Sequence, residues 1–276
     1  MAMRHRFVIA DVFTSRPFAG NQLAVFPDAS RIPQEAMQPI AREFNFAETT
    51  FVLPPRDPRH AARVRIFTPK AELPFAGHPT IGTAAVLIHR GLKKKAFVLE
   101  EGIGPIPIEV ADNGLVYFTH DKPVEVPEVK PALPGVAFEE AWFASAGVPF
   151  CFLRLKDKAA VDRAAWLPQL ANAWSPNLYV FCGEKDLYVR MFAPAQGITE
   201  DPATGSGAVA LASVLASRET RDGIFDWTID QGVAMGRPSR IEVSAEKREG
   251  RVVGIRVGGA SCIVAEGEME VPTSLP

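Results

Sequence analysis

The sequence predicts an α+β protein made of two similar halves, each a curled, mostly antiparallel sheet or barrel around one central helix. Short strand-like runs alternate with a single helix rich in small residues in each half. The run Arg65-Ile-Phe-Thr-Pro69 recurs as Arg190-Met-Phe-Ala-Pro194 at an offset of 125 residues, and the same offset brings Gly82 onto Gly207. Because glycine costs an exposed helix up to ~1 kcal/mol relative to alanine, its presence in both helices indicates that each is closely surrounded.

The composition is that of an ordinary globular protein. The chain has 276 residues, of which 47% are hydrophobic and 22% charged, and its formal net charge is −2. This length suits two domains of roughly 130 residues each. A nearly neutral chain gives no electrostatic reason to expect a nucleic-acid or membrane partner. No apolar run has the length of a signal peptide or a membrane span, so we expect a cytoplasmic protein.

The first half, residues 1–122, contains two predicted helices among short strands. Apolar side chains recur at helical spacing in residues 33–44, and a second helix is expected from Pro79 to Arg90, closed by Gly91. The strand-like runs are residues 7–12, 23–26, 49–53, 63–68, 96–100, 106–110 and 115–119.

The second half, residues 135–264, repeats this order with one helix expected from Thr204 to Ser217. Its strand-like runs are residues 150–155, 178–181, 187–192, 241–243, 252–257 and 261–265. We interpret the proline-rich passage 123–134 as the crossing between the domains. One option is that a strand near 265–276 completes the first domain.

Three segments depart from ordinary core and loop composition, and the first holds Glu48. This carboxylate is flanked by Phe46 and Phe51, so an inward-facing side chain would be desolvated, and desolvation raises the pKa of a carboxyl group. A carboxyl group poised closer to neutrality can both accept and return a proton. A surface glutamate near a helix end, or one paired with Arg42, is the alternative interpretation.

The second segment, Pro74-Phe-Ala-Gly77-His78-Pro79, directly precedes the second predicted helix. Gly77 would let the backbone approach a ligand closely, and the first amides of a helix face outward at the positive end of its dipole. His78 could transfer a proton or donate to a carboxylate. A histidine that only caps or packs the turn fits these residues equally well.

The third segment, Glu200-Asp201-Pro202-Ala-Thr204, runs into Gly205-Ser206-Gly207 at the start of the last predicted helix. Asp201 and Thr204 are candidate helix caps, and a proline suits the first turn. An ordinary capped helix start would explain those residues. It explains the two glycines poorly, because they leave backbone amides unshielded, as an anion cradle requires.

Neither a cofactor nor a metal is expected. The sequence contains no dinucleotide-binding or P-loop motif, and no isolated lysine suggests a pyridoxal Schiff base. The three cysteines, Cys151, Cys182 and Cys262, are far apart, and no CxxC pair or Cys/His cluster indicates a metal site.

Two glycine-rich helix starts, one in each half, instead indicate a single small anionic ligand. If a pseudo-twofold axis relates the halves, both helix starts can converge on one substrate carboxylate. Converging amides would stabilise the enolate-like charge that forms when an α-proton leaves. The pattern therefore favours isomerisation without a cofactor.

The three segments are similar to motifs of the phenazine-biosynthesis PhzF-like family, a branch of the diaminopimelate-epimerase-like fold. The stretches that match in the family's order are Asp11-Val-Phe-Thr, Pro17-Phe-Ala-Gly20-Asn21, Phe46-Ala-Glu48-Thr-Thr-Phe51, Phe75-Ala-Gly77-His78-Pro79-Thr80, Glu200-Asp201-Pro202-Ala-Thr-Gly205-Ser206, Gln231-Gly232 and Met235-Gly236-Arg237-Pro238-Ser239. The resemblance implies a homodimer that needs no metal. The named family enzyme moves a hydrogen between ring carbons of a dihydro-hydroxyanthranilate.

The resemblance also implies roles for individual residues in a cleft between the domains. Glu48 matches the family's acid/base glutamate, and the implied catalytic set is Glu48, His78 and Asp201. The implied substrate-binding residues are Asn21, Gly77, Gly205 and Ser206. Their ligand is expected to be a small carboxylate.

Two other functions stay open at this point. One is an amino- or hydroxy-acid epimerase or racemase. The two-thiol enzymes of this fold place a cysteine at each helix start, whereas His78 and Ser206 stand there in this chain, which argues against two-base chemistry by thiols. The other is a non-catalytic protein that binds small carboxylates or acts as a scaffold.

Overall fold

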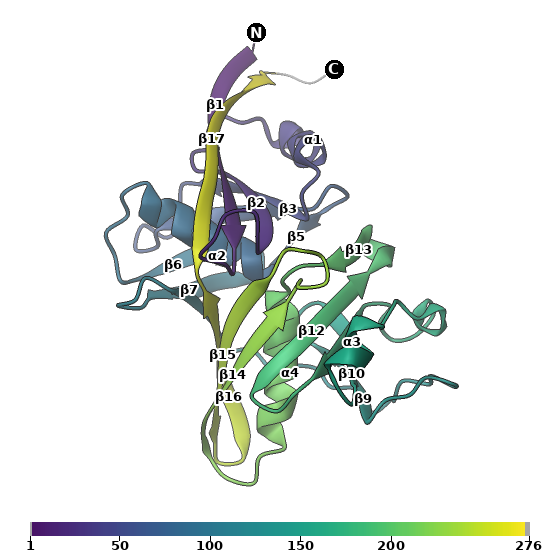
Figure 1. Cartoon of the computed structure of the whole chain (residues 1–276). Coiled ribbons are helices and arrows are strands. Elements are labelled where there is room, and N and C mark those ends of the chain that lie inside the picture. Colours follow the sequence, from purple (N-terminus) through teal and green to yellow (C-terminus); the bar gives the residue numbers. More distant parts are fainter. Residues whose placement is uncertain (1, 274–276) are drawn as a thin grey trace. The chain divides into compact units, whose positions relative to one another are not determined.

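The computed structural model describes residues 2–273 and divides into two compact units (Figure 1). Unit 1 consists of the chain up to Phe118 together with the chain from Gly258 onward, and unit 2 is Thr119–Val257. No helix among residues 2–273 is long and apolar enough to cross a membrane.

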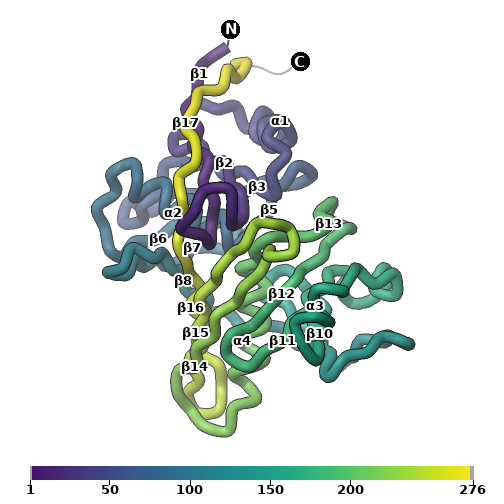
Figure 2. The backbone as a smooth tube through the Cα atoms, viewed as in Figure 1, coloured from purple at the N-terminus to yellow at the C-terminus, as the bar shows by residue number. Residues whose placement is uncertain are grey.

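Unit 1 is a curled sheet that both ends of the chain help to build. Its strands are β1 (Ala2–Val12), β2 (Asn21–Phe26), β3 (Glu48–Leu53), β4 (Ala62–Phe67), β5 (Glu72–Leu73), β6 (Ala96–Glu101), β7 (Gly104–Val110), β8 (Val116–His120) and β17 (Ser261–Pro272). Its helices are α1 (Gln34–Phe44) and α2 (Gly77–His89). The backbone tube shows β17 running antiparallel beside β1 along most of its length (Figure 2).

Unit 2 repeats this construction with a longer set of C-terminal strands. Its strands are β9 (Glu140–Ser145), β10 (Pro149–Arg154), β11 (Leu178–Cys182), β12 (Asp186–Ala193), β13 (Ile198–Asp201), β14 (Gly223–Gln231), β15 (Ser239–Arg248) and β16 (Arg251–Gly259). Its helices are α3 (Lys158–Asp162), α4 (Gly205–Ser217) and the short 3-10 turns η1 (Pro168–Leu170) and η2 (Pro194–Gln196). The proline-rich passage belongs to this unit, where Glu125 forms a bridge with Ser145.

The two units share one strand-pairing order. In unit 1, β1–β2 is antiparallel, β2–β3 parallel, β3–β4 antiparallel, β4–β6 parallel and β6–β7 antiparallel. In unit 2, β9–β10, β10–β11, β11–β12, β12–β14 and β14–β15 follow the same alternation. The predicted pair of α+β units with curled, mostly antiparallel sheets is thus confirmed, and the parallel pairs are β2–β3, β4–β6, β10–β11 and β12–β14.

One long helix in each unit is buried nearly all round, as its run of small residues predicts. A Cβ on Gly82 of α2 would lie 2.6 Å from side-chain atoms of both Leu23 and Val12. A Cβ on Gly207 of α4 would lie 2.6 Å from the ring of Tyr179. Both glycines are therefore required by close approach of neighbouring side chains.

The equivalence of Gly82 and Gly207 predicted from the constant offset is wrong. Helix α2 begins at Gly77 and α4 at Gly205, and 205 minus 77 is 128, three more than the offset of the strands. Of the three extra residues, one lies between Pro194 and β13, where η2 forms, and two lengthen β13 relative to β5. The true counterparts are therefore the two residues at each helix start, and α2 begins two residues earlier than expected.

Helix α1 forms where the apolar periodicity predicts it, and its end sets up the next strand. Its buried face packs on a phenylalanine cluster in which Phe26 and Phe51 stack with ring centroids 5.2 Å apart. Asn45 follows in the left-handed conformation with φ 51°, and its amide donates to Ala41 O. This cap reverses the chain and leads directly into β3, whose first residue is Glu48.

Candidate active site

The start of β3 places Glu48 inside unit 1. The residue is 8% exposed, and its backbone lies opposite Leu23 of the neighbouring parallel strand β2. Since the pairing fixes the register, the side chain cannot turn to the solvent face without a slip of the whole strand. The surface interpretation of this glutamate is wrong.

His78 is the second residue of α2 and faces Glu48. It is 4% exposed, and its Nε2 lies 3.4 Å from Glu48 Oε2. The N-cap residue Ala76 makes no side-chain capping bond, and its extended backbone turns the chain from β5 into α2. The imidazole thus lies beside the carboxylate, and whether His78 acts in catalysis or only packs the turn stays a prediction.

Asn21, the first residue of β2, contacts the other side of the imidazole. Its Nδ2 lies 3.2 Å from His78 Nδ1 in a buried contact. The three side chains of Asn21, His78 and Glu48 thus come from two strands and a helix start, and they form one buried polar row. Gly77 lies beside this row, at the first position of α2.

Burial lowers the pKa of His78 to about 3, and a hydrogen bond with the Gln22 backbone opposes this only in part. The imidazole is therefore neutral near pH 7. A neutral imidazole has one donor and one acceptor nitrogen. It can accordingly donate a hydrogen bond to the Glu48 carboxylate, or accept one from the Glu48 carboxylic acid, without adding a charge to the buried site.

In unit 2, Asp201 anchors the turn that begins α4. This last residue of β13 is 6% exposed, and its Oδ2 accepts a hydrogen bond of 2.5 Å from Thr204 Oγ1. Gln231 Nε2 donates to Asp201 O and to Thr204 Oγ1, at 2.7 and 2.8 Å, and Gln231 Oε1 accepts from the Thr204 amide. Gln231 entered the sequence analysis only within a motif, because a polar residue in a strand gives no sign of which turn it will hold.

Gly205 and Ser206 form the first turn of α4 directly after this anchored turn. Both are buried, and the N-cap Thr204 makes no side-chain bond to the first-turn amides. Neither α2 nor α4 has an acidic residue in its first turn. The amides at both helix starts therefore present partial positive charge to whatever lies in front of them.

The structure thus groups the predicted residues into two sets. Glu48, His78, Asn21 and Gly77 lie together in unit 1, and the remaining three, Asp201, Gly205 and Ser206, lie together in unit 2. His78 and Ser206 occupy equivalent positions, each the second residue of its helix. Their catalytic and binding roles stay predictions.

No cysteine lies at either helix start. Cys151 and Cys182 are buried in the core of unit 2, and burial raises the pKa of Cys151 to about 12. A thiol in this state is not a nucleophile or base near neutral pH. Among residues 2–273, no three His, Cys, Asp or Glu side chains gather closely enough to hold a metal ion.

A family model described as phenazine biosynthesis-like protein matches residues 10–267. The chain belongs to this family. Among curated members, a protein from Mesorhizobium japonicum that is named an uncharacterized isomerase is 39% identical, with 95% of this chain and 98% of the relative covered. The trans-2,3-dihydro-3-hydroxyanthranilate isomerase of Pseudomonas aeruginosa is also 39% identical, with the same coverage of both chains.

Solved structures of a PhzF-family protein and of an epimerase share the fold. A PhzF-family protein of Bacillus anthracis has a TM-score of 0.84 at 24% identity, with 97% of this chain and 99% of that chain covered. A hydroxyproline epimerase of Agrobacterium vitis has a TM-score of 0.66 at 14% identity, with 97% and 92% covered. The predicted diaminopimelate-epimerase-like fold is therefore confirmed for this PhzF-family chain.

Proposed function

We propose that this PhzF-family chain is a cofactor-independent isomerase that moves a proton within a small carboxylate substrate, with Glu48 as the acid/base group. Isomerase as the enzyme class is the activity named for its relatives at 39% identity over nearly the whole chain. A dihydro-hydroxyanthranilate, the substrate in the name of the P. aeruginosa relative, is the proposed substrate class.

The observation that carries this proposal is the buried pair of Glu48 and His78, 3.4 Å apart. In the proposed reaction the Glu48 carboxylate removes a proton from a saturated ring carbon, and the electron pair of that C–H bond passes into the adjacent unsaturated system. The carboxylic acid then returns the proton to a second carbon. The carboxylate is regenerated, and no electron leaves the substrate.

His78 is proposed to hold the acid form of Glu48 in place between the two steps. Because the imidazole is neutral, it can act as a hydrogen-bond partner for either protonation state of the carboxyl group. Asn21 orients the ring by its contact with Nδ1. A buried partner of fixed orientation keeps the transferred proton from exchanging with water.

The substrate carboxylate is proposed to bind to backbone amides at the helix starts. Gly77, Gly205 and Ser206 would supply the amides, and Asp201 would support the second helix start through Thr204. The support for this step is that both first turns lack a side-chain cap and an acidic residue. A carboxylate supplies the negative charge that such termini favour.

The test is the substitution Glu48→Gln, with Glu43→Gln as the matched control. Glu43 lies five residues earlier on the exposed face at the end of α1. Loss of a general acid/base group costs ~10²- to 10⁴-fold in rate, so Glu48→Gln is expected to reduce the isomerisation of trans-2,3-dihydro-3-hydroxyanthranilate at least that far. Binding of 3-hydroxyanthranilate by calorimetry should persist, and Glu43→Gln should behave as wild type. Near-wild-type turnover in Glu48→Gln would remove Glu48 from the mechanism.

Running the reaction in deuterated water and analysing the product by NMR distinguishes the proposed isomerase from the other two functions. An epimerase would incorporate solvent deuterium at one carbon with inversion of its configuration, as NMR would show. A binding or scaffold protein would bind carboxylates without any exchange. The proposed migration requires a product whose hydrogen has moved to a different carbon.

A further inference from the structure

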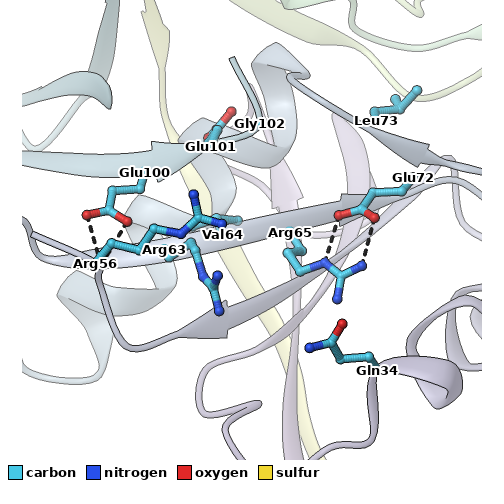
Figure 3. Close-up of a pocket in the computed structure, with 10 residues that line it drawn as sticks. All are labelled: Gln34, Arg56, Arg63, Val64, Arg65, Glu72, Leu73, Glu100, Glu101 and Gly102. Atoms are coloured by element: carbon cyan, nitrogen blue, oxygen red, sulfur yellow. Dashed lines mark hydrogen bonds and ion pairs between the residues drawn. The ribbon is translucent and has the colours of Figure 1, made fainter. Parts of the chain in front are cut away.

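Unit 1 carries a second polar pocket of about 380 Å³ that the proposed reaction does not use (Figure 3). It is formed by β4, β5, the end of β6 and its hairpin turn, the loop after β3, and the first residue of α1. Its lining residues are Gln34, Arg56, Arg63, Val64, Arg65, Glu72, Leu73, Glu100, Glu101 and Gly102. The pocket contains three arginine guanidinium groups, and three negative charges would be needed to neutralise them.

Two of the three acidic groups are already committed. Arg65 forms a two-pronged ion pair with Glu72, through contacts of 2.7 Å from both Nε and Nη2. Glu100 accepts the backbone amides of Arg56 and Asp57 at 2.8 to 3.0 Å and contacts His60 Nδ1 at 2.9 Å. Its carboxylate therefore organises the backbone of the loop rather than neutralising an arginine side chain.

The third acidic group, Glu101, adds no compensating charge near pH 7. Burial raises its pKa to about 8, and a hydrogen bond with Thr80 opposes this only in part. With Glu101 neutral, the three arginines face two carboxylates, and the pocket has a net charge of +1.

The guanidinium groups of Arg56 and Arg63 remain. Neither forms an ion pair with any of residues 2–273, and Arg63 Nε is buried without a hydrogen-bond partner among them. Figure 3 shows both guanidinium groups between Glu100 on one side and the Arg65–Glu72 pair on the other. A buried Nε without an acceptor is costly for Arg63, so an incoming anion would be stabilised by Arg63 and would gain a second, exposed guanidinium from Arg56.

In unit 2, the polar groups on the same face of the equivalent strand find their hydrogen-bond partners within the chain. At the offset of 125, Tyr188 replaces Arg63, and its hydroxyl donates to Asp162 Oδ1 at 2.6 Å. Arg190, the counterpart of Arg65, donates from Nη1 to the backbone oxygens of Asp162 and Ala164, each at 2.8 Å. Helix α3 and the turn after it thus satisfy this face from within the chain.

We propose that the pocket between β4 and the loop after β3 binds a small anion bearing a phosphate or carboxylate group, held by Arg56 and Arg63. A guanidinium presents two parallel N–H groups that match two oxygens of either anion. The open strand face in unit 1, against the closed one in unit 2, gives the ligand its room. The site is independent of Glu48 and of the proposed reaction.

The test is calorimetric titration of the full chain with inorganic phosphate in one arm and malonate in the other. The variants are Arg63→Gln and Arg56→Gln, and Arg251→Gln is the control because it removes the same charge from an exposed position outside the pocket. Saturable binding that weakens at least ten-fold in both pocket variants and is unchanged in Arg251→Gln is the expected result. Tighter binding of phosphate than of malonate would assign the ligand as a phosphate compound, and the reverse would assign a carboxylate.

Binding that is absent from the wild type, or equal in the wild type and both pocket variants, would overturn the proposal. Arg56 is exposed, so Arg56→Gln is expected to fold even if Arg63→Gln does not. Isomerase activity of Arg56→Gln should remain at the wild-type level, which separates this site from the one built on Glu48.

Discussion

The buried carboxyl group of Glu101 should make the stability of the protein depend on pH in a direction opposite to that of most acidic residues. Glu101 Oε1 lies 2.7 Å from Thr80 Oγ1, and that hydroxyl also lies 2.8 Å from Ala76 O. Thr80 Oγ1 is the donor in both contacts, and because a hydroxyl has one hydrogen, it can donate to only one of the two acceptors at a time. The Thr80 hydroxyl therefore offsets the burial of the carboxyl group only in part, in agreement with a pKa of about 8.

The sign and size of the effect follow from linkage. The unfolded chain loses this proton near the ordinary pKa of 4.5, whereas the folded chain keeps it up to about pH 8. The unfolded state thus binds fewer protons between these values, so the contribution of Glu101 is fully present below pH 4.5 and is lost as the pH rises to 8. The interval between the two pKa values, at ~1.36 kcal/mol per pH unit, sets an upper limit of ~5 kcal/mol on the contribution of Glu101 to the free energy of unfolding.

Glu101→Gln tests this reasoning, because the amide keeps the shape and cannot ionise. Urea unfolding of both proteins at pH 5, 6, 7 and 8 should show the wild type losing stability relative to the variant as the pH rises. Other titrating groups are common to both proteins and cancel in the difference. Parallel curves for the two proteins over this range would refute the assignment of Glu101 as a protonated group.

Three further substitutions probe the loop, the central helix and the site. Phe18→Gly should raise the free energy of unfolding in urea by up to ~1 kcal/mol. Phe18 is 75% exposed, and its φ of 66° is one that glycine adopts without strain. A loss of stability would contradict this reasoning. Gly207→Ala should lower the free energy of unfolding by ~1–3 kcal/mol, because the added Cβ would overlap the Tyr179 ring. The control Gly254→Ala, with open space around the new Cβ, should lower it by less than half as much. Equal losses in the two variants would disprove the close approach. His78→Gln should lower kcat. It should leave the shape of the plot of rate against pH unchanged between pH 5 and 8, since the pKa of His78 is about 3. If the wild-type rate instead changed with an apparent pKa near 6.5 and the variant lost that change, the imidazole would be charged in this range.

Much of the fold could be predicted because its signals are local. The amphipathic spacing of α1 and the small residues of α2 and α4 are direct consequences of where each helix packs. The sequence analysis did not predict strands β5, β9, β13 and β14 or the short helix α3. In β9 the run Glu140–Ser145 lacks clear alternation, and β5 and β13 have only two and four residues. Strand β14 does carry a strand signal, because its aromatic and aliphatic residues alternate with polar ones.

The candidate site was only partly predictable. The residues around Glu48 left its burial open, because the direction of the side chain depends on the register of β3 against β2, which is a long-range property. The constant offset misplaced Gly82 because one extra residue near η2 and two in β13 shift the second helix start. Local sequence patterns do not reveal such an insertion.

The anion pocket could not be predicted from the sequence. Arg63 and Arg65 alternate with the buried Val64, a pattern typical of the solvent face of a strand. Their significance depends on which carboxylates are used elsewhere, and those lie on β5 and β6. The contrast with Tyr188 and Arg190 becomes visible only when the two units are compared in three dimensions.

The most direct measurement is a crystal structure of the protein soaked with 3-hydroxyanthranilate. We expect the ligand carboxylate to accept hydrogen bonds from backbone amides at the starts of α2 and α4. A Glu48 oxygen should lie about 3–3.5 Å from a ring carbon, which is the separation at which a proton transfer can begin. A ligand that leaves Glu48 distant from the ring, or a carboxylate bound away from both helix starts, would contradict it.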